Sequence, residues 1–307
     1  MTSSRPSEYH HPVLLEAVLD AAAGAVRVVD ATLGGGGHAS PLRAGGATVL
    51  GIDRDPGAVA EARRLMGDAG ITYLNLPYSD PGALRAVSDF HPDFVLLDLG
   101  ISSRQLDDDS RGFTFRPGVR LDMRMGAEGS TAAELLNDAS EADLRRLFGD
   151  YGDEPRAARL AREVVRRRAN AAFLLSDDFV NAIRAVLGPR AGPDEFARLF
   201  QALRIAVNDE LTGLSLALPG LREALTPGGR LAVISYHSGE DRIVKHLFRE
   251  WARACICPPA FPMCTCRGHP LGRVLTLRAI TPEVAEAVRN PRARSARLRI
   301  FQVANER

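Results

Sequence analysis

Short apolar runs alternate with helical stretches over the first hundred residues of this 307-residue chain. The runs at 26–29, 48–53 and 92–100 have the length and composition of buried strands. Between them, the stretches 56–66 and 81–88 have the pattern of helices. Strands that alternate with helices are typical of βαβ units, in which the strands run parallel. The sequence therefore predicts an α/β fold with a parallel sheet.

The pattern changes after Gly100. Residues 105–125 are polar and rich in turn-forming residues, which predicts a long ordered loop. Helical patterns follow without an intervening strand, at 131–136, 141–148, 154–168, 176–187 and 193–208. Ser140 and Ser176 precede acidic residues at two of these helix starts, where a serine can cap backbone N–H groups. Strand patterns return only at 230–235, 274–279 and 298–303. We therefore expect residues 106–208 to form an inserted all-helical domain, and 1–105 with 209–307 to form the α/β domain.

A glycine-rich loop, Asp30-Ala-Thr-Leu-Gly-Gly-Gly-Gly-His38, follows the first predicted strand, and Asp53 ends the second. Glycines let the backbone turn tightly and approach a ligand closely. An acidic residue at the end of the next strand can accept hydrogen bonds from a ribose diol. The order strand, glycine loop, helix, strand and acid therefore predicts a nucleoside site, although a glycine loop can also bind nothing.

The form of the loop restricts the ligand. It matches neither G-x-G-x-x-G nor the lysine-containing loop that binds phosphates, which disfavours a nicotinamide dehydrogenase. A nucleoside without phosphates, such as S-adenosylmethionine, fits better. The Pro-Gly-Gly turn at 227–229, before a late strand, is common in Rossmann-like methyltransferases. We therefore predict a Rossmann-like class I methyltransferase sheet with an inserted all-helical domain.

Composition and charge add limits on partners and location. The formal net charge of +1 gives no overall basic signal, so a nucleic-acid surface must be local. One candidate is a helix face with arginines at 156, 159, 162 and 166, which is equally a solvated face. The other is the tail 289–299, which has five arginines and no acidic residue, with Arg297 and Arg299 on one strand face. No signal peptide or membrane-spanning run is evident, so we expect a cytoplasmic protein without a membrane partner.

In combination, several motifs resemble the bacterial 16S ribosomal RNA (cytosine-N4)-methyltransferase family, also called RsmH or MraW. These motifs lie at 11–18, 30–38, 51–56, 96–103, 105–107, 111–115, 121–125, 200–205, 234–238, 240–245 and 290–295. The resemblance implies S-adenosylmethionine as cofactor and the small ribosomal subunit, through its 16S rRNA, as partner. The implied reaction is N4-methylation of one cytidine in the decoding region. The sequence indicates no oligomeric state.

The resemblance also implies which residues form the site. The cofactor residues would be Gly36, Gly37, His38, Asp53, Tyr78, Asp98 and Gln105. His38 could instead cap a helix or pack in the core. Asp98, Ser102 and Ser103 would be catalytic, as acceptors for the target amine at the carboxyl end of the fourth strand.

One departure concerns the target base. The Asp/Ser/Asn-Pro-Pro-Tyr motif of DNA amino-methyltransferases is replaced by Asp98-Leu-Gly-Ile, so its aromatic platform is missing. Tyr236 and Phe115 are the hypotheses for a residue that stacks on the base. No general base is assigned, because the proton can pass to water after methyl transfer.

Two further alternatives stay open. Cys255, Cys257, Cys264 and Cys266 form two Cys-x-Cys pairs, which could bind zinc but which we interpret first as reduced surface thiols, so no metal is assigned. A ribosome-assembly factor with a vestigial cofactor pocket would share the same motifs.

Overall fold

The computed structural model describes residues 12–257, 263 and 265–305. The chain divides into two compact units, one comprising Met1–Gly100 with Gly213–Arg307 and the other Ile101–Thr212. No helix within the described ranges is long and apolar enough to cross a membrane.

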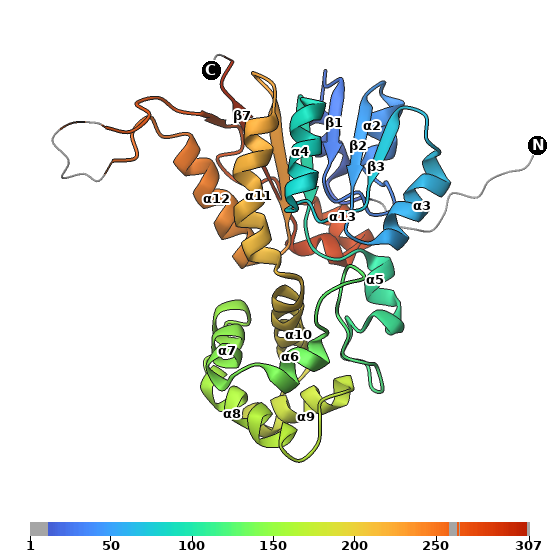
Figure 1. Ribbon diagram of the computed structural model, residues 1–307, viewed down its shortest axis with the longest axis vertical. Coiled ribbons are helices and arrows are strands. Elements are labelled where there is room, and N and C mark those ends of the chain that lie inside the picture. The colour runs from blue at the N-terminus through green and yellow to red at the C-terminus, as the bar shows by residue number, and fades with distance from the viewer. Residues whose placement is uncertain (1–11, 258–262, 264, 306–307) are drawn as a thin grey trace, which may run out of the picture. The chain divides into compact units, whose positions relative to one another are not determined.

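The first unit is built on a seven-stranded sheet of order β3-β2-β1-β4-β5-β7-β6 (Figure 1). Its strands are β1 (Arg27–Asp30), β2 (Thr48–Ile52), β3 (Ile71–Leu74), β4 (Phe94–Asp98), β5 (Arg230–Ser235), β6 (Gly272–Val274) and β7 (Arg297–Val303). Strands β1 to β5 pair in parallel, and β7 is antiparallel to both β5 and β6. This confirms the predicted Rossmann-like class I sheet.

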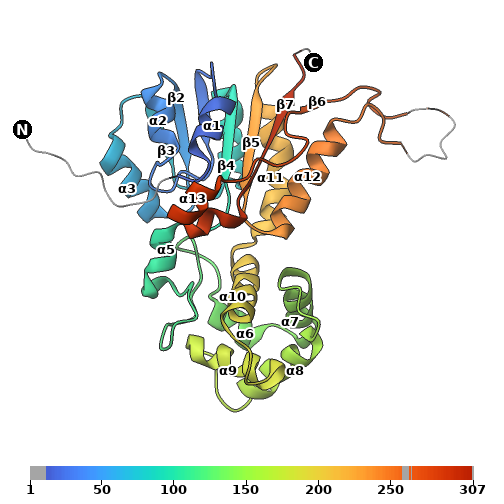
Figure 2. The same ribbon diagram turned by 180° about the vertical axis from the view of Figure 1, so that it is seen from behind.

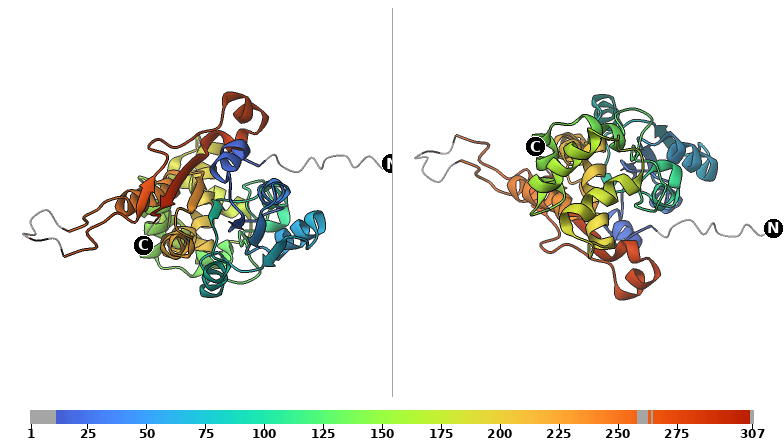
Figure 3. Two further views of the ribbon diagram at one scale, coloured as in Figure 1. Left: turned by 90° about the horizontal axis from the view of Figure 1, so that it is seen from above. Right: turned by 90° about the horizontal axis from the view of Figure 1, so that it is seen from below.

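Helices cover both faces of this sheet (Figures 2 and 3). One face packs against α1 (Leu15–Ala21), α2 (Ala39–Ala44), α3 (Pro56–Met66) and the 3-10 helix η3 (Pro291–Ser295). The other packs against α4 (Pro81–Phe90), α11 (Glu210–Ala224) and α12 (Ser238–Trp251). Residues 94–97 of β4 and 231–234 of β5 are all apolar, as expected for strands that are buried on both faces. The short helix α13 (Val284–Arg289) precedes η3.

The predicted strand at 274–279 is wrong in its extent. Strand β6 ends at Val274, and only an isolated bridge from Ile280 to Leu298 follows. The Thr276 hydroxyl accepts a hydrogen bond from the backbone N–H of Ile300 at 2.9 Å. The Thr276 hydroxyl thus takes the place of a backbone carbonyl as the acceptor for Ile300. The regular ladder of backbone hydrogen bonds between strands ends there.

The second unit is helical. It contains α5 (Ser103–Asp107), the 3-10 helix η1 (Asp109–Arg111), α6 (Ala132–Asp138), α7 (Glu141–Arg146), the π-helical turn η2 (Leu147–Tyr151), α8 (Ala157–Arg168), α9 (Ser176–Leu187) and α10 (Pro193–Asn208). Its core includes Phe148, Phe179 and Phe200, with ring centroids 5.7 and 5.4 Å apart along this row.

One of the two predicted serine caps is wrong. Ser140 caps α7 as predicted, accepting from the Asp143 N–H at 3.1 Å. Ser176 instead lies inside α9, fully buried, and its hydroxyl donates to the Arg116 carbonyl. The Asp178 carboxylate accepts from the N–H groups of residues 174 and 175 in its place. A carboxylate near a helix start also interacts favourably with the helix dipole.

Candidate active site

Three aspartates gather where parallel strands end. Asp30 is the last residue of β1, Asp98 is the last of β4, and Asp53 directly follows β2. Strands β2, β1 and β4 are neighbours in the sheet, so their carboxyl ends lie side by side. Burial raises the pKa of Asp30, and the charges of Asp98 and Asp53 raise it further.

The glycine loop begins beside these carboxyls. Gly34 has φ +51° and donates its N–H to Asp53 Oδ2 at 2.8 Å. Gly36 has φ +83°, and a Cβ there would lie 2.5 Å from Met66 Cε. A Cβ at Gly35 would meet nothing within 4 Å, so a ligand has open access to the loop backbone at that point.

Asp53 is held by backbone donors. Its two oxygens accept from the N–H groups of Gly34 and Asp55, each at 2.8 Å. A carboxylate offers about four lone-pair sites, so acceptor capacity for a ribose diol remains. Burial raises the pKa of Asp53, and these backbone hydrogen bonds oppose the rise.

Asp98 lies between two aromatic side chains. Tyr236 follows β5 and donates its hydroxyl to Asp98 Oδ1 at 2.8 Å. His38 Nδ1 lies 3.7 Å from Asp98 Oδ2, while His38 Nε2 lies 3.0 Å from the Val13 carbonyl. A carbonyl only accepts, so Nε2 must carry the proton, and Nδ1 of the neutral ring faces Asp98 with its lone pair.

Burial shifts the pKa values of Asp98, Asp30 and His38. It raises the pKa of Asp98 to about 7, helped by the charge of Glu240 and opposed by the Tyr236 hydrogen bond. It raises the pKa of Asp30 to about 6, and the hydrogen bond from the Thr32 backbone N–H opposes this shift. Burial also lowers the pKa of His38. Near neutral pH the site therefore contains a neutral histidine and a carboxyl that readily gains or loses a proton.

This donor set fits S-adenosylmethionine. The cofactor has a ribose diol, a sulfonium and an ammonium but no phosphate, and carboxylates match each of these groups. Asp53 would hold the ribose, and Asp30 with Asp98 would face positive charge. A phosphate would instead be repelled by three carboxyls.

The other predicted site residues lie in varied surroundings. Gly37 is exposed, and a Cβ there would lie 3.3 Å from Pro12 Cβ. Tyr78 is partly buried against the core on the α4 side of the sheet.

Ser102 and Gln105 form a capping box at α5 in the helical unit, each side chain accepting from the backbone N–H of the other. Ser103 is the first residue of that helix. The cofactor and catalytic roles of these residues stay predictions.

The capping interpretation of His38 is wrong, because it precedes α2 without a side-chain capping bond and its ring instead contacts Val13 and Asp98. Phe115 is partly buried against the core of the helical unit, with its ring edge-to-face against Phe196 and Phe200. This packing does not favour Phe115 as the stacking residue. Tyr236 donates its hydroxyl to Asp98, so the contact that the structure shows for it is with that carboxyl. Its role in stacking on the base stays a prediction.

The sequence did not single out Asp30 or Glu240 as site residues. Glu240 is buried and accepts from the backbone N–H groups of Tyr236 and His237 at 2.8 and 3.3 Å. It thereby fixes the turn that carries Tyr236. The sequence contains one feature that could have identified Glu240. It stands three residues after the N-cap His237, the position of the glutamate in a capping box.

The arginine tail is only partly available to nucleic acid. Arg299 is buried and pairs with Asp241, its Nε 2.7 Å from Oδ1 and its second guanidinium nitrogen 3.1 Å from Oδ2. Arg297 also pairs with Asp241, at 3.2 Å. The prediction that these two arginines form a nucleic-acid contact is therefore wrong for Arg299. Arg292 and Arg294, on η3, are exposed.

Comparison with known proteins places these observations in a family. The chain matches the MraW methylase family over residues 7–304. It is 52% identical to ribosomal RNA small subunit methyltransferase H of Gemmatimonas aurantiaca, with 98% of each chain covered. It is 45% identical to the protein of the same name from Heliobacterium modesticaldum, with 95% of this chain and 97% of that one covered. The match spans nearly the whole chain, as the sequence motifs predicted. This protein therefore belongs to the MraW methylase family and is an S-adenosylmethionine-dependent methyltransferase.

Proposed function

We propose that this enzyme methylates the N4 amine of one cytidine in the decoding region of 16S ribosomal RNA. The names of its relatives, ribosomal RNA small subunit methyltransferase H, support ribosomal RNA of the small subunit as the substrate. The observation that carries the proposal is Asp98, a carboxyl at the end of β4 with a pKa raised to about 7. The finer target, N4 of a cytidine, rests on the family resemblance and on this chemistry.

The exocyclic amine of cytosine is a weak nucleophile because its lone pair is delocalised into the ring. S-adenosylmethionine supplies a methyl group that its sulfonium already activates. In the proposed reaction an N–C bond forms at N4, the C–S bond breaks, the sulfur keeps the electron pair as a thioether, and N4 loses one proton. The protein must position the amine and take up that proton.

Asp98 suits both tasks. Its Oδ1 accepts the Tyr236 hydroxyl, and we propose that Oδ2 accepts an N–H of the amine. Accepting that hydrogen bond localises the nitrogen lone pair. A pKa near 7 lets the ionised carboxyl take the proton at neutral pH, as an efficient general base does. We propose Ser102 and Ser103, which follow shortly after Asp98 in the chain, as further acceptors.

The decisive experiment is methyl transfer from labelled S-adenosylmethionine to small ribosomal subunits from cells that lack the modification. Nucleosides are then separated and identified. The proposal predicts N4-methylcytidine, formed at one position. Label in another nucleoside would refute the N4 target. No label, despite measured cofactor binding, would favour the assembly-factor alternative.

Cofactor affinity should depend on pH because of the raised carboxyl pKa values. A cationic ligand favours ionised carboxyls, so protonation of Asp98 and Asp30 must weaken binding as pH falls through about 7 and about 6. We expect the Kd of S-adenosylmethionine, measured by calorimetry, to rise by about tenfold or more between about pH 8 and about pH 5.5. S-adenosylhomocysteine lacks the sulfonium charge and should show a smaller change. An equal Kd at both pH values would contradict this assignment.

We further propose that the helical unit and the exposed η3 arginines bind the RNA that flanks the target. Within the helical unit, an open concavity of about 590 Å³ is lined by Arg167, Arg184 and Asn181, among other residues. Glu163 pairs with Arg166 and Arg167, so the α8 arginine face is partly neutralised.

The double variant Arg292→Gln/Arg294→Gln tests the η3 surface. Each lost phosphate contact lowers the salt dependence of binding. For two lost contacts we expect about tenfold weaker RNA binding at low salt and a salt slope smaller by about 1.5. Cofactor affinity should be unchanged. Arg85→Gln is the matched control, because Arg85 is an exposed arginine on α4, which packs on the opposite face of the sheet. Equal effects of the two changes would argue against a specific role for η3.

A further inference from the structure

The segment between α12 and β6 has little to hold it in place. Its described residues, 252–257, 263 and 265–271, contain neither helix nor strand. Ile256 and Met263 are 41% and 77% exposed, so apolar burial contributes little to its conformation. At its base, Arg267 donates to the carbonyls of Glu250 and Arg253, at 2.5 and 3.0 Å. These bonds anchor one end of the segment to the end of α12 but do not order the rest.

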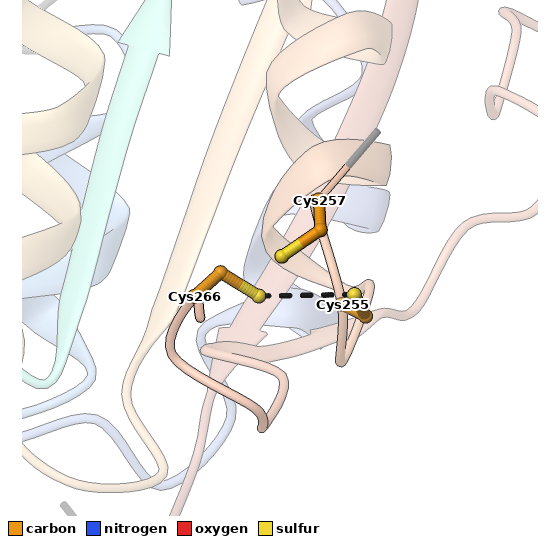
Figure 4. Close-up of side chains that lie close together, drawn as sticks. All are labelled: Cys255, Cys257 and Cys266. Atoms are coloured by element: carbon orange, nitrogen blue, oxygen red, sulfur yellow. Dashed lines mark hydrogen bonds between the residues drawn. The ribbon is translucent and has the colours of Figure 1, made fainter. Parts of the chain in front are cut away.

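Three cysteines converge within this segment. The Sγ atoms of Cys255, Cys257 and Cys266 all lie within 4.8 Å of one another, and their side chains point toward a common centre (Figure 4). Cys255 and Cys266 Sγ are 3.8 Å apart. A disulfide would require about 2.05 Å. Around zinc at a Zn–S distance of about 2.3 Å, tetrahedral geometry places two sulfurs about 3.8 Å apart.

Two polar groups lie beside the sulfurs. The backbone N–H of Ile256 points at Cys266 Sγ, at 3.4 Å, and the Thr265 hydroxyl oxygen lies 4.0 Å from Cys257 Sγ. Such outer contacts orient metal ligands and strengthen a site. They link the two arms of the segment, residues 255–257 and 265–266, on either side of the sulfur cluster.

We propose that Cys255, Cys257 and Cys266 bind one zinc ion through their Sγ atoms. Each thiol that binds gives up its proton, so three protons leave for each ion bound by these three residues. Thiolates are soft ligands that suit zinc, and a bound ion replaces the core that this exposed segment lacks. The fourth tetrahedral position needs another ligand. Cys264 lies outside the described residues and has no part in this argument.

Metal analysis of the full-length protein tests the site. The protein is purified under reducing conditions, stripped with a chelator, and titrated with Zn²⁺ alone and with Co²⁺ as a spectroscopic probe. We expect one Zn²⁺ per chain, and a Co²⁺ spectrum with thiolate charge-transfer bands and tetrahedral ligand-field bands. Cys255→Ser and Cys266→Ser should each weaken Zn²⁺ binding by about 100-fold or more, since even outer-contact changes cost 10- to 100-fold.

Met263→Ser is the matched control, because it changes an exposed, non-cysteine residue of the same segment. It should bind Zn²⁺ as the wild type does. Circular dichroism and cofactor affinity report whether each variant is folded, independently of its metal content. Absence of stoichiometric zinc in the reduced wild type, or wild-type affinity in both cysteine variants, would overturn the proposal. So would a Cys255–Cys266 disulfide in a protein that binds no zinc after reduction, which would indicate a redox pair instead.

Discussion

Replacing Asp98 with Asn is expected to reduce methyl transfer by about 10²- to 10⁴-fold, the usual contribution of a general acid or base. Asn cannot take up the amine proton, although its carbonyl can still accept the Tyr236 hydroxyl. If Asp98 acts as proposed, kcat should fall at every pH, and the pH dependence near 7 should disappear from kcat/KM for S-adenosylmethionine, which reports the cofactor-free enzyme. Methyl transfer to small ribosomal subunits, measured across pH, checks this. A variant with wild-type kcat would exclude Asp98 from the chemistry.

The same variant should be more stable than the wild type at high pH. The pKa of Asp98 rises from 3.8 to about 7 on folding, so the folded state binds more protons between these values. The free energy of unfolding therefore falls as pH increases through this window. A pKa shift of one unit corresponds to ~1.4 kcal/mol, so the total loss is up to ~4 kcal/mol. Asn removes this cost. The Tm of the cofactor-free variant should exceed that of the wild type at about pH 8, with no gain at about pH 4.

Asp20→Asn provides a matched control for this stability measurement. Asp20 is an exposed carboxylate on α1, in the same unit. Its replacement should change Tm little at either pH, as surface substitutions usually do. A lower Tm for Asp98→Asn at high pH would mean that the ionised carboxyl stabilises the fold, contrary to the burial argument.

The second large effect concerns the buried ion pair between α12 and β7. Asp241→Asn should destabilise the protein by about 3–5 kcal/mol, because Arg299 would remain buried without its carboxylate. Burial alone would raise the pKa of Asp241, but the hydrogen bonds and charges of Arg299 and Arg297 lower it overall. This contribution is therefore present above pH 3.8 and is lost as pH falls through the depressed value. Urea unfolding at neutral pH measures the loss.

The two arginines on Asp241 provide an internal comparison. The Arg297 side chain is 54% exposed and Arg299 is 10% exposed, although both pair with the same carboxylate. Arg297→Met should cost about 1 kcal/mol or less, as exposed pairs do. Arg299→Met should cost several times more, since the Asp241 carboxylate loses its bidentate partner. Replacing both Asp241 and Arg299 with apolar residues should recover much of the loss. Equal effects of Arg297→Met and Arg299→Met would show that burial does not govern this pair.

Local pattern was sufficient to predict most of the sheet. The runs at 26–29 and 48–53 match β1 and β2 closely, and the helix predicted at 56–66 has the bounds of α3. These elements were predictable because period and end signals lie within the segment itself. The strand predicted at 274–279 failed because the Thr276 hydroxyl bonds to the distant Ile300, which no local pattern records.

The site was predictable only in part, for a similar reason. The glycine loop, Asp53 and Asp98 stand at strand ends and so are visible in sequence order. The Tyr236 contact with Asp98 depends on the pairing of β4 with β5, whose register sets Asp98 opposite Ile234. The burial of Arg299 depends on where α12 places Asp241, so its charge alone suggested a surface role.

One contact between distant parts of the chain bears on synthesis. Glu286 Oε1 accepts the backbone N–H of Leu14 at 2.7 Å, beside Val13, whose carbonyl holds His38. Strand β7, which ends at Val303, lies between β5 and β6 and completes the sheet. A nascent chain that has emerged only through β5 therefore contains the glycine loop and all three aspartates, but lacks the clamp on Leu14. Because chains emerge from their N-termini, this clamp can form only after Glu286 has left the ribosome.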